Sequence, residues 1–315
     1  MENNMHKIKG KYNISLCGNY VVLFGDMLSI FNKDGSIVAH KKNLRNIHKI
    51  VAISEDSILA DCGSPKAYVA LSLSDGAEVW SLSHPRLDYT SRGFAIPPDN
   101  SAVYDYYDLK GSQYLLKIDL TTREMTTISL ESGLRCISDL ACDEKGTLCL
   151  LEHHYEIIGE KHISINGIRY VYEDSVCPGN AYNWKSKWAF DFPTISKFFL
   201  GNTDTVLTKD LFVYQPKTGK KYHLLENESR FELPECEPYD WKISSNKQYV
   251  ILLYKDTNIV VDITTKKVVA RYNTDFYHGC LIDDQYWVCL DDHIQIKPFP
   301  FFENIPASKP CFWYN

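Results

Sequence analysis

The sequence predicts an all-β fold: a seven-bladed β-propeller of four-stranded antiparallel blades, built by residues 1–315 as a single domain and closed by a terminal strand. The aromatic content is high, with 21 Tyr, 14 Phe and 6 Trp, and aromatic side chains favour half-buried pleated sheets. A unit of two strands around a short polar turn recurs at intervals of about 41–52 residues, which matches the ~40–50-residue period of propeller blades. No long window repeats apolar residues with the helical period.

Six short polar turns mark the repeating unit. They are Lys33-Asp34-Gly35, Ser74-Asp75-Gly76, Thr121-Thr122-Arg123, Asn166-Gly167, Lys217-Thr218-Gly219 and Thr264-Thr265-Lys266. Asp-Gly and Asn-Gly supply the positive φ angles that tight hairpins need. We therefore expect each turn to join the two outer strands of one blade.

Strand-like segments flank every turn. The pairs are Leu28–Phe31 with Ile37–His40, Tyr68–Leu73 with Glu78–Leu82, Tyr114–Leu120 with Met125–Leu130, His162–Ile165 with Ile168–Tyr172, Leu211–Tyr214 with Lys221–Leu225, and Asn258–Ile263 with Val268–Tyr272. Two further short strands precede each pair, for example Asn13–Cys17 and Tyr20–Phe24 in the first unit. Four strands per unit are the number that a propeller blade contains.

The seventh unit is incomplete. It supplies three strands, Gly279–Ile282, Tyr286–Leu290 and His293–Pro298. The fourth strand must come from a chain end, either Met5–Ile8 or Cys311–Tyr314. Such a strand closes the ring and leaves only short, protected sheet edges.

Charge and cysteine usage restrict the class of protein. The formal net charge is -6, which argues against a nucleic-acid partner because a binder needs a basic face. No apolar run reaches 18 residues and the first residues lack a signal-peptide core, so we expect no membrane span. The ten cysteines form no C-x-x-C pair, which indicates free thiols in a reducing, cytoplasmic location and no zinc site.

The repeat resembles the WD40/YVTN/quinoprotein-like propeller superfamily. The segment Leu71-Ser-Leu-Ser-Asp75-Gly76-Ala-Glu-Val-Trp80 is similar to quinoprotein-type repeats, and Asp119 and Asp262 resemble the strand-ending Asp of WD40-type repeats. No Gly-His opens the units and no Trp-Asp closes them, so the WD40 hydrogen-bond relay and a bound quinone are not expected. The resemblance implies a scaffold that presents loops on one face, and we expect no cofactor.

Two clusters carry residues with catalytic or metal-binding chemistry. Glu152-His153-His154 follows the strand 147–151 and is interpreted either as a metal-ligand pair or general base at a loop, or as a solvated loop. Asp291-Asp292 precedes His293 and is either a cation or proton site or, as the turn preference of Asp favours, a charged turn.

Three predicted inter-blade loops, 83–92, 173–196 and 227–239, carry aromatic and arginine side chains. The candidate binding residues there and at equivalent positions of later units are Arg86, Tyr89, Arg92, Trp184, Trp188, Trp241 and Tyr277. Trp, Tyr and Arg dominate the binding energy of protein interfaces. The repeat register predicts that these segments surround one mouth of the channel. For the insert 173–196, an interaction surface and a loop that buries its own rings remain equally open.

These features favour two functions over a third, a regulatory subunit or component of a larger complex. The first is a non-catalytic scaffold that mediates protein–protein interaction through loops on one face. The second is a hydrolase-like propeller enzyme or small-ligand binder with a site at the channel mouth. The chain lacks G-x-S-x-G, a P-loop, a dinucleotide fingerprint and H-E-x-x-H, but propeller enzymes gather single residues from several blades.

Overall fold

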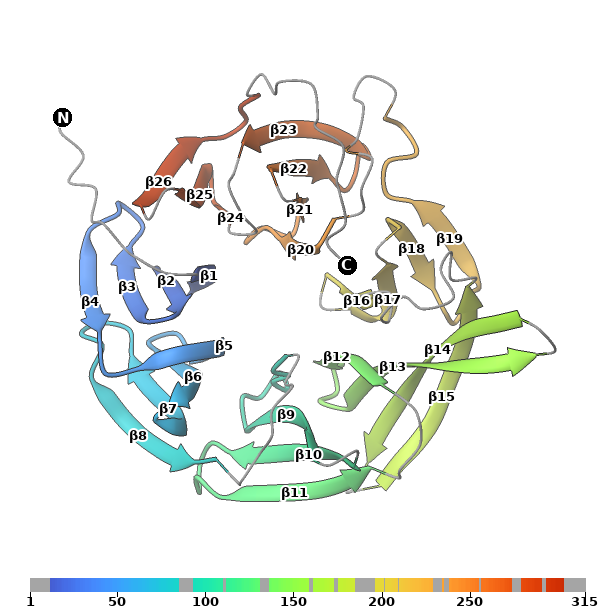
Figure 1. Cartoon of the computed structure of the whole chain (residues 1–315), viewed down its shortest axis with the longest axis horizontal. Coiled ribbons are helices and arrows are strands. Elements are labelled where there is room, and N and C mark those ends of the chain that lie inside the picture. Colours follow the sequence, from blue (N-terminus) through green and yellow to red (C-terminus); the bar gives the residue numbers. More distant parts are fainter. Residues whose placement is uncertain are drawn as a thin grey trace.

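The computed structural model shows seven antiparallel sheets arranged as blades around a central axis (Figure 1). It describes residues 12–84, 93–109, 112–130, 136–158, 161–172, 175–184, 196–200, 202–208, 210–228, 234, 238–254, 256–273, 279–290 and 293–302. All regular secondary structure within these ranges is β-strand. The predicted seven-bladed propeller is therefore confirmed.

Within each blade the strands follow the chain from the axis outward (Figure 1). Blade 1 contains β1 (Tyr12–Cys17), β2 (Tyr20–Gly25), β3 (Leu28–Asn32) and β4 (Ile37–Lys41), and blade 2 contains β5 (Arg45–Ser54), β6 (Ser57–Ser64), β7 (Lys66–Ser72) and β8 (Glu78–Ser83). Blade 3 contains β9 (Ala102–Leu109), β10 (Ser112–Asp119) and β11 (Met125–Leu130), and blade 4 contains β12 (Cys136–Cys142), β13 (Leu148–Ile158), β14 (Lys161–Tyr172) and β15 (Ser175–Trp184).

The remaining three blades follow the same order. Blade 5 contains β16 (Ser196–Phe199), β17 (Asn202–Thr208), β18 (Phe212–Gln215) and β19 (Lys220–His223), and blade 6 contains β20 (Asp240–Ile243), β21 (Tyr249–Leu253), β22 (Thr257–Asp262) and β23 (Lys267–Asn273). Blade 7 contains β24 (Gly279–Ile282), β25 (Gln285–Leu290) and β26 (His293–Pro298).

Blades 3 and 7 each have three strands among the described residues. In blade 3 the innermost position is taken by a short segment around Ala95, which exchanges two backbone hydrogen bonds with Tyr104 of β9. In blade 7 the three strands match the predicted ones closely. Both segments proposed to complete this blade, Met5–Ile8 and Cys311–Tyr314, lie outside the described residues.

Five of the six predicted outer turns are confirmed. In blades 3 and 6 the last residue of the strand before the outer turn, β10 or β22, organises that turn: Asp119 Oδ1 accepts the backbone N–H groups of Thr121 and Thr122 at 2.9 and 2.8 Å. Asp262 Oδ1 does the same in blade 6, with Thr264 and Thr265. The Thr122 and Thr121 N–H groups hold the pKa of Asp119 below its usual value, because they stabilise the ionised carboxylate.

The predicted turn at Asn166-Gly167 is wrong. Both residues lie inside the continuous strand β14, where Gly167 pairs with Glu152 of β13 and with Ala181 of β15. The predicted loop 173–196 correspondingly contains strand β15. Pro178 is tolerated there because β15 is the outermost strand, whose free edge needs no N–H donor from proline.

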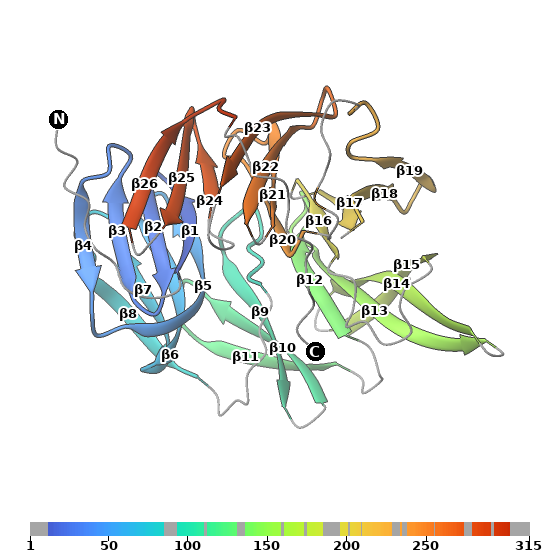
Figure 2. The same cartoon turned by 45° about the horizontal axis from the view of Figure 1, so that its top comes forward.

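Blade 4 also extends beyond its innermost strand. The pairing of β12 with β13 begins at Cys136 and His153, so the segments 154–158 and 161–165 continue past β12. They form a hairpin that projects away from the ring (Figures 1 and 2). The described part of the ring therefore carries one protruding element besides its blades.

Apolar clusters fill all seven junctions between neighbouring blades. Alternate residues of a middle strand contribute to different junctions, because successive side chains point to opposite faces of a sheet. On β2, Val21 and Leu23 pack toward blade 7, whereas Val22 packs toward blade 2. Each sheet is thus buried on both faces.

The junction between blades 7 and 1 joins distant parts of the chain. The rings of Phe31 and Trp287 meet edge to face with their centroids 6.5 Å apart. Trp287 is fully buried, and Cys280 and Ile282 pack beside it against β1 and β2. At the surface, Lys33 Nζ lies 2.8 Å from Asp283 Oδ2. These contacts close the ring among the described residues.

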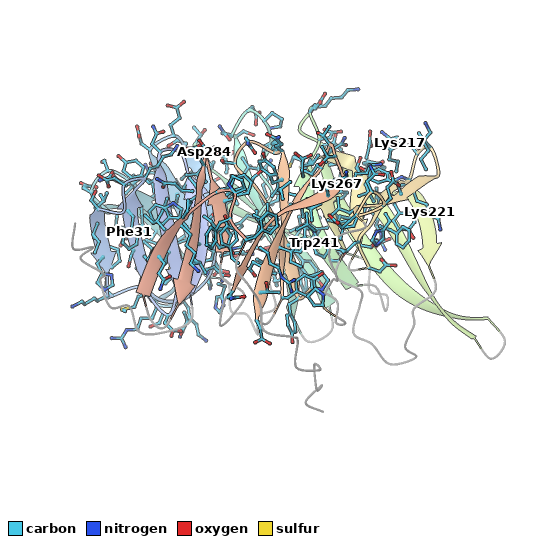
Figure 3. The ribbon with its side chains drawn as sticks, turned by 90° about the horizontal axis from the view of Figure 1, so that it is seen from above. Phe31, Lys217, Lys221, Trp241, Lys267 and Asp284 are labelled. Atoms are coloured by element: carbon cyan, nitrogen blue, oxygen red, sulfur yellow. The ribbon has the colours of Figure 1, made fainter. Side chains whose placement is uncertain are left out.

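The two faces of the ring carry different connections. Because the strands alternate in direction, the turns between first and second and between third and fourth strands lie on one face. Asp284 and Lys217, in two such turns, lie along the same edge in Figure 3. The connections from the outermost strand of one blade to the next blade emerge on the opposite face, which we call the loop face.

Two turn glycines provide a matched test of blade packing. Gly76 has φ +70°, and a Cβ there would lie 2.5 Å from Ala39 Cβ of blade 1. Gly219 has φ +69° and no atom within 4 Å of such a Cβ. We expect Gly219→Ala to cost about 1–2 kcal/mol of unfolding free energy through backbone strain alone.

Gly76→Ala should cost about 1–3 kcal/mol more, because the added methyl group separates two packed blades. Urea denaturation of both variants measures the difference. Equal costs for the two substitutions would contradict the close approach of blades 1 and 2.

Candidate functional site

A cavity of about 600 Å³ lies in the central channel. Its walls come mainly from the innermost strands of five blades, β1, β5, β16, β20 and β24. Four charged side chains line it, the lysines Lys49, Lys197 and Lys242 and the carboxylate Asp240. We refer to this space as the channel cavity.

Lys49 is held by a buried carboxylate behind the cavity wall. Its ammonium group pairs with Asp105 Oδ1, and the Asp105 side chain is 0% exposed. The other carboxylate oxygen of Asp105 accepts a 2.7 Å hydrogen bond from the Tyr68 hydroxyl. Lys49 on β5 and Tyr68 on β7 thereby join blade 2 to Asp105 of blade 3. A buried charge needs such partners because desolvation of a lone ion is costly.

A second ion pair crosses from blade 5 to blade 6. Lys197 Nζ lies 2.6 Å from Asp240 Oδ1, and Lys197 also lies 5.8 Å from the centroid of the Trp241 ring. The same carboxylate oxygen accepts the Trp241 backbone N–H at 2.8 Å. Asp240 is thus occupied by one ammonium and one amide.

Lys242 differs from the other two lysines. Its ammonium donates a 3.0 Å hydrogen bond to the backbone carbonyl of Ile14 on β1. Among the described residues it forms no ion pair within 4 Å. Burial lowers the pKa of Lys242, because desolvation penalises the charged form.

Asp139 belongs to β12 of blade 4, and the charge of Lys197 on β16 acts on it. Its Oδ2 accepts the Phe198 backbone N–H at 2.8 Å, which joins blade 4 to blade 5. Burial raises the pKa of Asp139 to about 6, although the charge of Lys197 opposes the shift. Asp139 is not part of the cavity wall.

A buried polar contact lies just before the segment 85–92. His84 Nε2 lies 3.0 Å from Asp61 Oδ1, and both side chains are buried. The His84 ring also packs on Tyr68, with 4.4 Å between the ring centroids. The sequence signal for Asp61 is a charged residue inside an apolar strand, but nothing in the sequence pairs it with His84.

The two residues that follow this segment contact Lys49. Lys49 Nζ donates a 3.2 Å hydrogen bond to the Gly93 carbonyl. The ammonium also lies 4.2 Å from the centroid of the Phe94 ring. The residues on either side of the segment 85–92, His84 and Gly93, are therefore both in contact with side chains of blade 2.

The structure places Glu152, His153 and His154 inside strand β13 rather than at a loop. Glu152 is buried, and its Oε2 lies 2.6 Å from Arg169 Nε of β14. This pair lies within blade 4 and does not line the channel cavity. The side chains of both histidines, together with Asp291 and Asp292, fall outside the part of the chain that is described.

The predicted binding residues are placed only in part. Trp184 ends strand β15, and its side chain is not described, while Arg86, Tyr89, Arg92, Trp188 and Tyr277 lie outside the described ranges. Trp241 is 4% exposed and packs in the junction between blades 5 and 6. Its ring therefore belongs to the core and not to an exposed rim, because β20 directs it between two sheets.

The described cysteines Cys17, Cys62, Cys142, Cys149 and Cys280 are free thiols, as the spacing predicts. Burial raises the pKa of Cys17 and Cys62 to about 12, so both stay protonated at neutral pH. Within the described ranges, no group of three His, Cys, Asp or Glu side chains is arranged to hold a metal ion. The same part of the chain contains no helix long and apolar enough to cross a membrane.

Known structures share the fold but little sequence. The β-propeller domain of Cps50 (Swd1) from Myceliophteria thermophila superposes with a TM-score of 0.60 at 11% identity, over 93% of this chain and 98% of that one. TolB from Acinetobacter baumannii gives a TM-score of 0.48 at 13% identity, over 82% of this chain and 64% of that one. The first likeness confirms the β-propeller architecture and, at this identity, shows the fold alone.

Comparisons by sequence add no relative. No protein-family model matches the chain, and no curated protein matches it. The propeller is therefore placed by its architecture, without a specific subfamily.

The Lys49–Asp105 pair is expected to be a structural requirement of the site. Lys49→Met leaves Asp105 buried without its ammonium partner, which typically costs about 3–5 kcal/mol of unfolding free energy. Lys217→Met is the control, because Lys217 pairs with Asp204 at 2.6 Å on the exposed surface. Such an exposed pair contributes at most about 1 kcal/mol.

Chemical denaturation of the two variants measures both costs. If Lys49→Met unfolds as readily as the Lys217→Met control, the buried pair does not tie blade 2 to blade 3.

Proposed function

We propose that this chain is a non-catalytic scaffold that binds another protein through the loops on one face of its propeller. The propeller fold, and its likeness to a WD40-like propeller structure, support a role in protein interaction in general terms.

The observation that carries the proposal is the anchoring of the loop 85–92. His84 before this segment packs on Tyr68 and donates its backbone N–H to the Lys66 carbonyl, and Gly93 after the segment accepts a hydrogen bond from Lys49. The loop itself supplies two arginines and a tyrosine. A binding loop with fixed ends loses less conformational entropy on association, so more of the contact energy appears as affinity.

A second loop-face connection has fixed borders as well. Glu228 accepts the Val268 backbone N–H at 2.8 Å before the segment 229–237. After that segment, Asp240 is held by Lys197. Blades 5 and 6 thereby hold both borders of this connection in place.

The composition of the loop-face segments favours a protein partner. Arg86, Tyr89, Arg92, Trp184 and Trp188 belong to the residue types that dominate interface hot spots. The net charge of -6 disfavours a nucleic-acid partner, which would need a basic face to neutralise phosphates. A cytoplasmic location and the absence of a cofactor are part of the same proposal.

Affinity capture tests the loop face against the opposite face. The loop-face variant carries Arg86→Ala, Tyr89→Ala and Arg92→Ala, and the control variant carries Lys145→Ala and Lys217→Ala in turns of the opposite face. Circular dichroism and urea denaturation first establish that both variants fold like the wild type. We expect recovery of the wild-type partner to fall by about tenfold or more in the loop-face variant, because hot-spot truncations typically cost 2 kcal/mol or more.

Recovery should stay unchanged in the control variant. If the loop-face variant recovers the partner as well as the wild type does, this loop is not the binding surface. Replacement of the segment 184–188 by Gly and Ser then examines the insert of blade 4 in the same assay.

A further inference from the structure

The channel cavity contains an ammonium group, that of Lys242, which forms no ion pair within 4 Å among the described residues, although the charge of Asp240 acts on it. Lys242 Nζ contacts the Ile14 carbonyl at 3.0 Å, and an ammonium group has three hydrogen atoms to donate. The Ile14 carbonyl oxygen accepts one of these three hydrogen atoms, and it carries only a partial negative charge. Two donor positions of Lys242 therefore remain for a ligand or solvent.

The carboxylates nearest to the cavity are already engaged. Asp240 binds Lys197 and the Trp241 amide, and Asp105 binds Lys49 and the Tyr68 hydroxyl. Asp139, the other acid near Lys197, does not line the cavity, and its carboxylate accepts the Phe198 backbone N–H. The cavity wall itself presents three ammonium groups and one carboxylate.

The rest of the wall suits an organic molecule. Asn13, Ser15 and Ser245 contribute polar groups that can donate hydrogen bonds. Leu16, Phe24, Ile50 and Ile243 contribute apolar surface. A volume of about 600 Å³ lies within the range of small-molecule sites, which combine apolar walls with a few polar groups.

We infer that the channel cavity binds a small organic anion, whose carboxylate or phosphate group is held by the Lys242 ammonium and whose apolar part lies against Phe24 and Ile50. This inference is independent of the protein-binding role of the loop face. Desolvation lowers the pKa of Lys242 and the charge of Asp240 opposes this shift in part, so a bound anion would oppose it further.

Isothermal titration calorimetry with three probes tests the site. Benzoate offers a carboxylate on an apolar ring, benzamide offers the same shape without the charge, and inorganic phosphate offers the charge without the ring. We expect the full-length wild type to bind at least one of the two anions about tenfold or more tightly than benzamide, since hydrogen bonds to charged groups contribute about 1.5–3 kcal/mol.

Two lysine variants separate the site from general electrostatics. Lys242→Met should lose the preference for the anion, whereas Lys220→Met, which removes an exposed lysine on β19, should keep it. Wild-type affinities for benzoate and phosphate no higher than that for benzamide would overturn the inference. Unchanged anion binding in Lys242→Met would overturn it as well.

A measurement on the wild type decides the matter if Lys242→Met does not fold. The lysine side-chain resonances are followed by NMR during titration with the same anions, and Lys242→Arg supplies the assignment. We expect Lys242 to show the largest saturable shift and a raised pKa when the anion is bound. A Lys242 resonance that moves no more than that of Lys220 would refute the site.

Discussion

Burial of both faces of every sheet is the constraint on which the rest of this structure depends. Alternate residues of a middle strand belong to different apolar clusters, as Val21, Val22 and Leu23 do on β2. Such a sheet exposes apolar surface to water unless it has a neighbour on each side. The first and last blades satisfy this requirement only by packing against each other, through Phe31 and Trp287. The ring shape thus follows from the alternation of side chains.

The same constraint leaves polar groups for the axis and for the connections between blades. The innermost strands face a channel, and Lys49, Lys197 and Lys242 lie along it. None of these residues stood out in the sequence, because each is a single charged residue on a different blade. The closed ring places the three lysines around one cavity, and a single sequence carries no signal for this proximity. For the segment 85–92 the situation is the opposite. Its residue types identified it as a candidate binding segment, whereas the structure describes only the residues that border it, His84 and Gly93.

Local turn chemistry made most of the fold predictable. Asp and Gly at the outer turns and the regular spacing of those turns gave five of six hairpins correctly. Blade 4 was misread because Asn166-Gly167, a typical turn pair, lies within the long strand β14, which continues into the protruding hairpin. Pro178 and Gly179 then made β15 resemble a loop. An outermost strand tolerates such residues because one edge is unpaired, and that position is a property of the assembled sheet.

Native-state hydrogen exchange tests the closed ring most directly. In an open array of repeats the end units have one neighbour each and unfold most easily. In a closed ring, blades 1 and 7 have the same number of neighbours as all others. The account predicts that the slowest amides of β2 and β25 exchange with the same free energy as those of β10 and β21, and that this value equals the global unfolding free energy. Exchange of β2 and β25 through a distinctly cheaper opening would contradict a ring closed between blades 7 and 1.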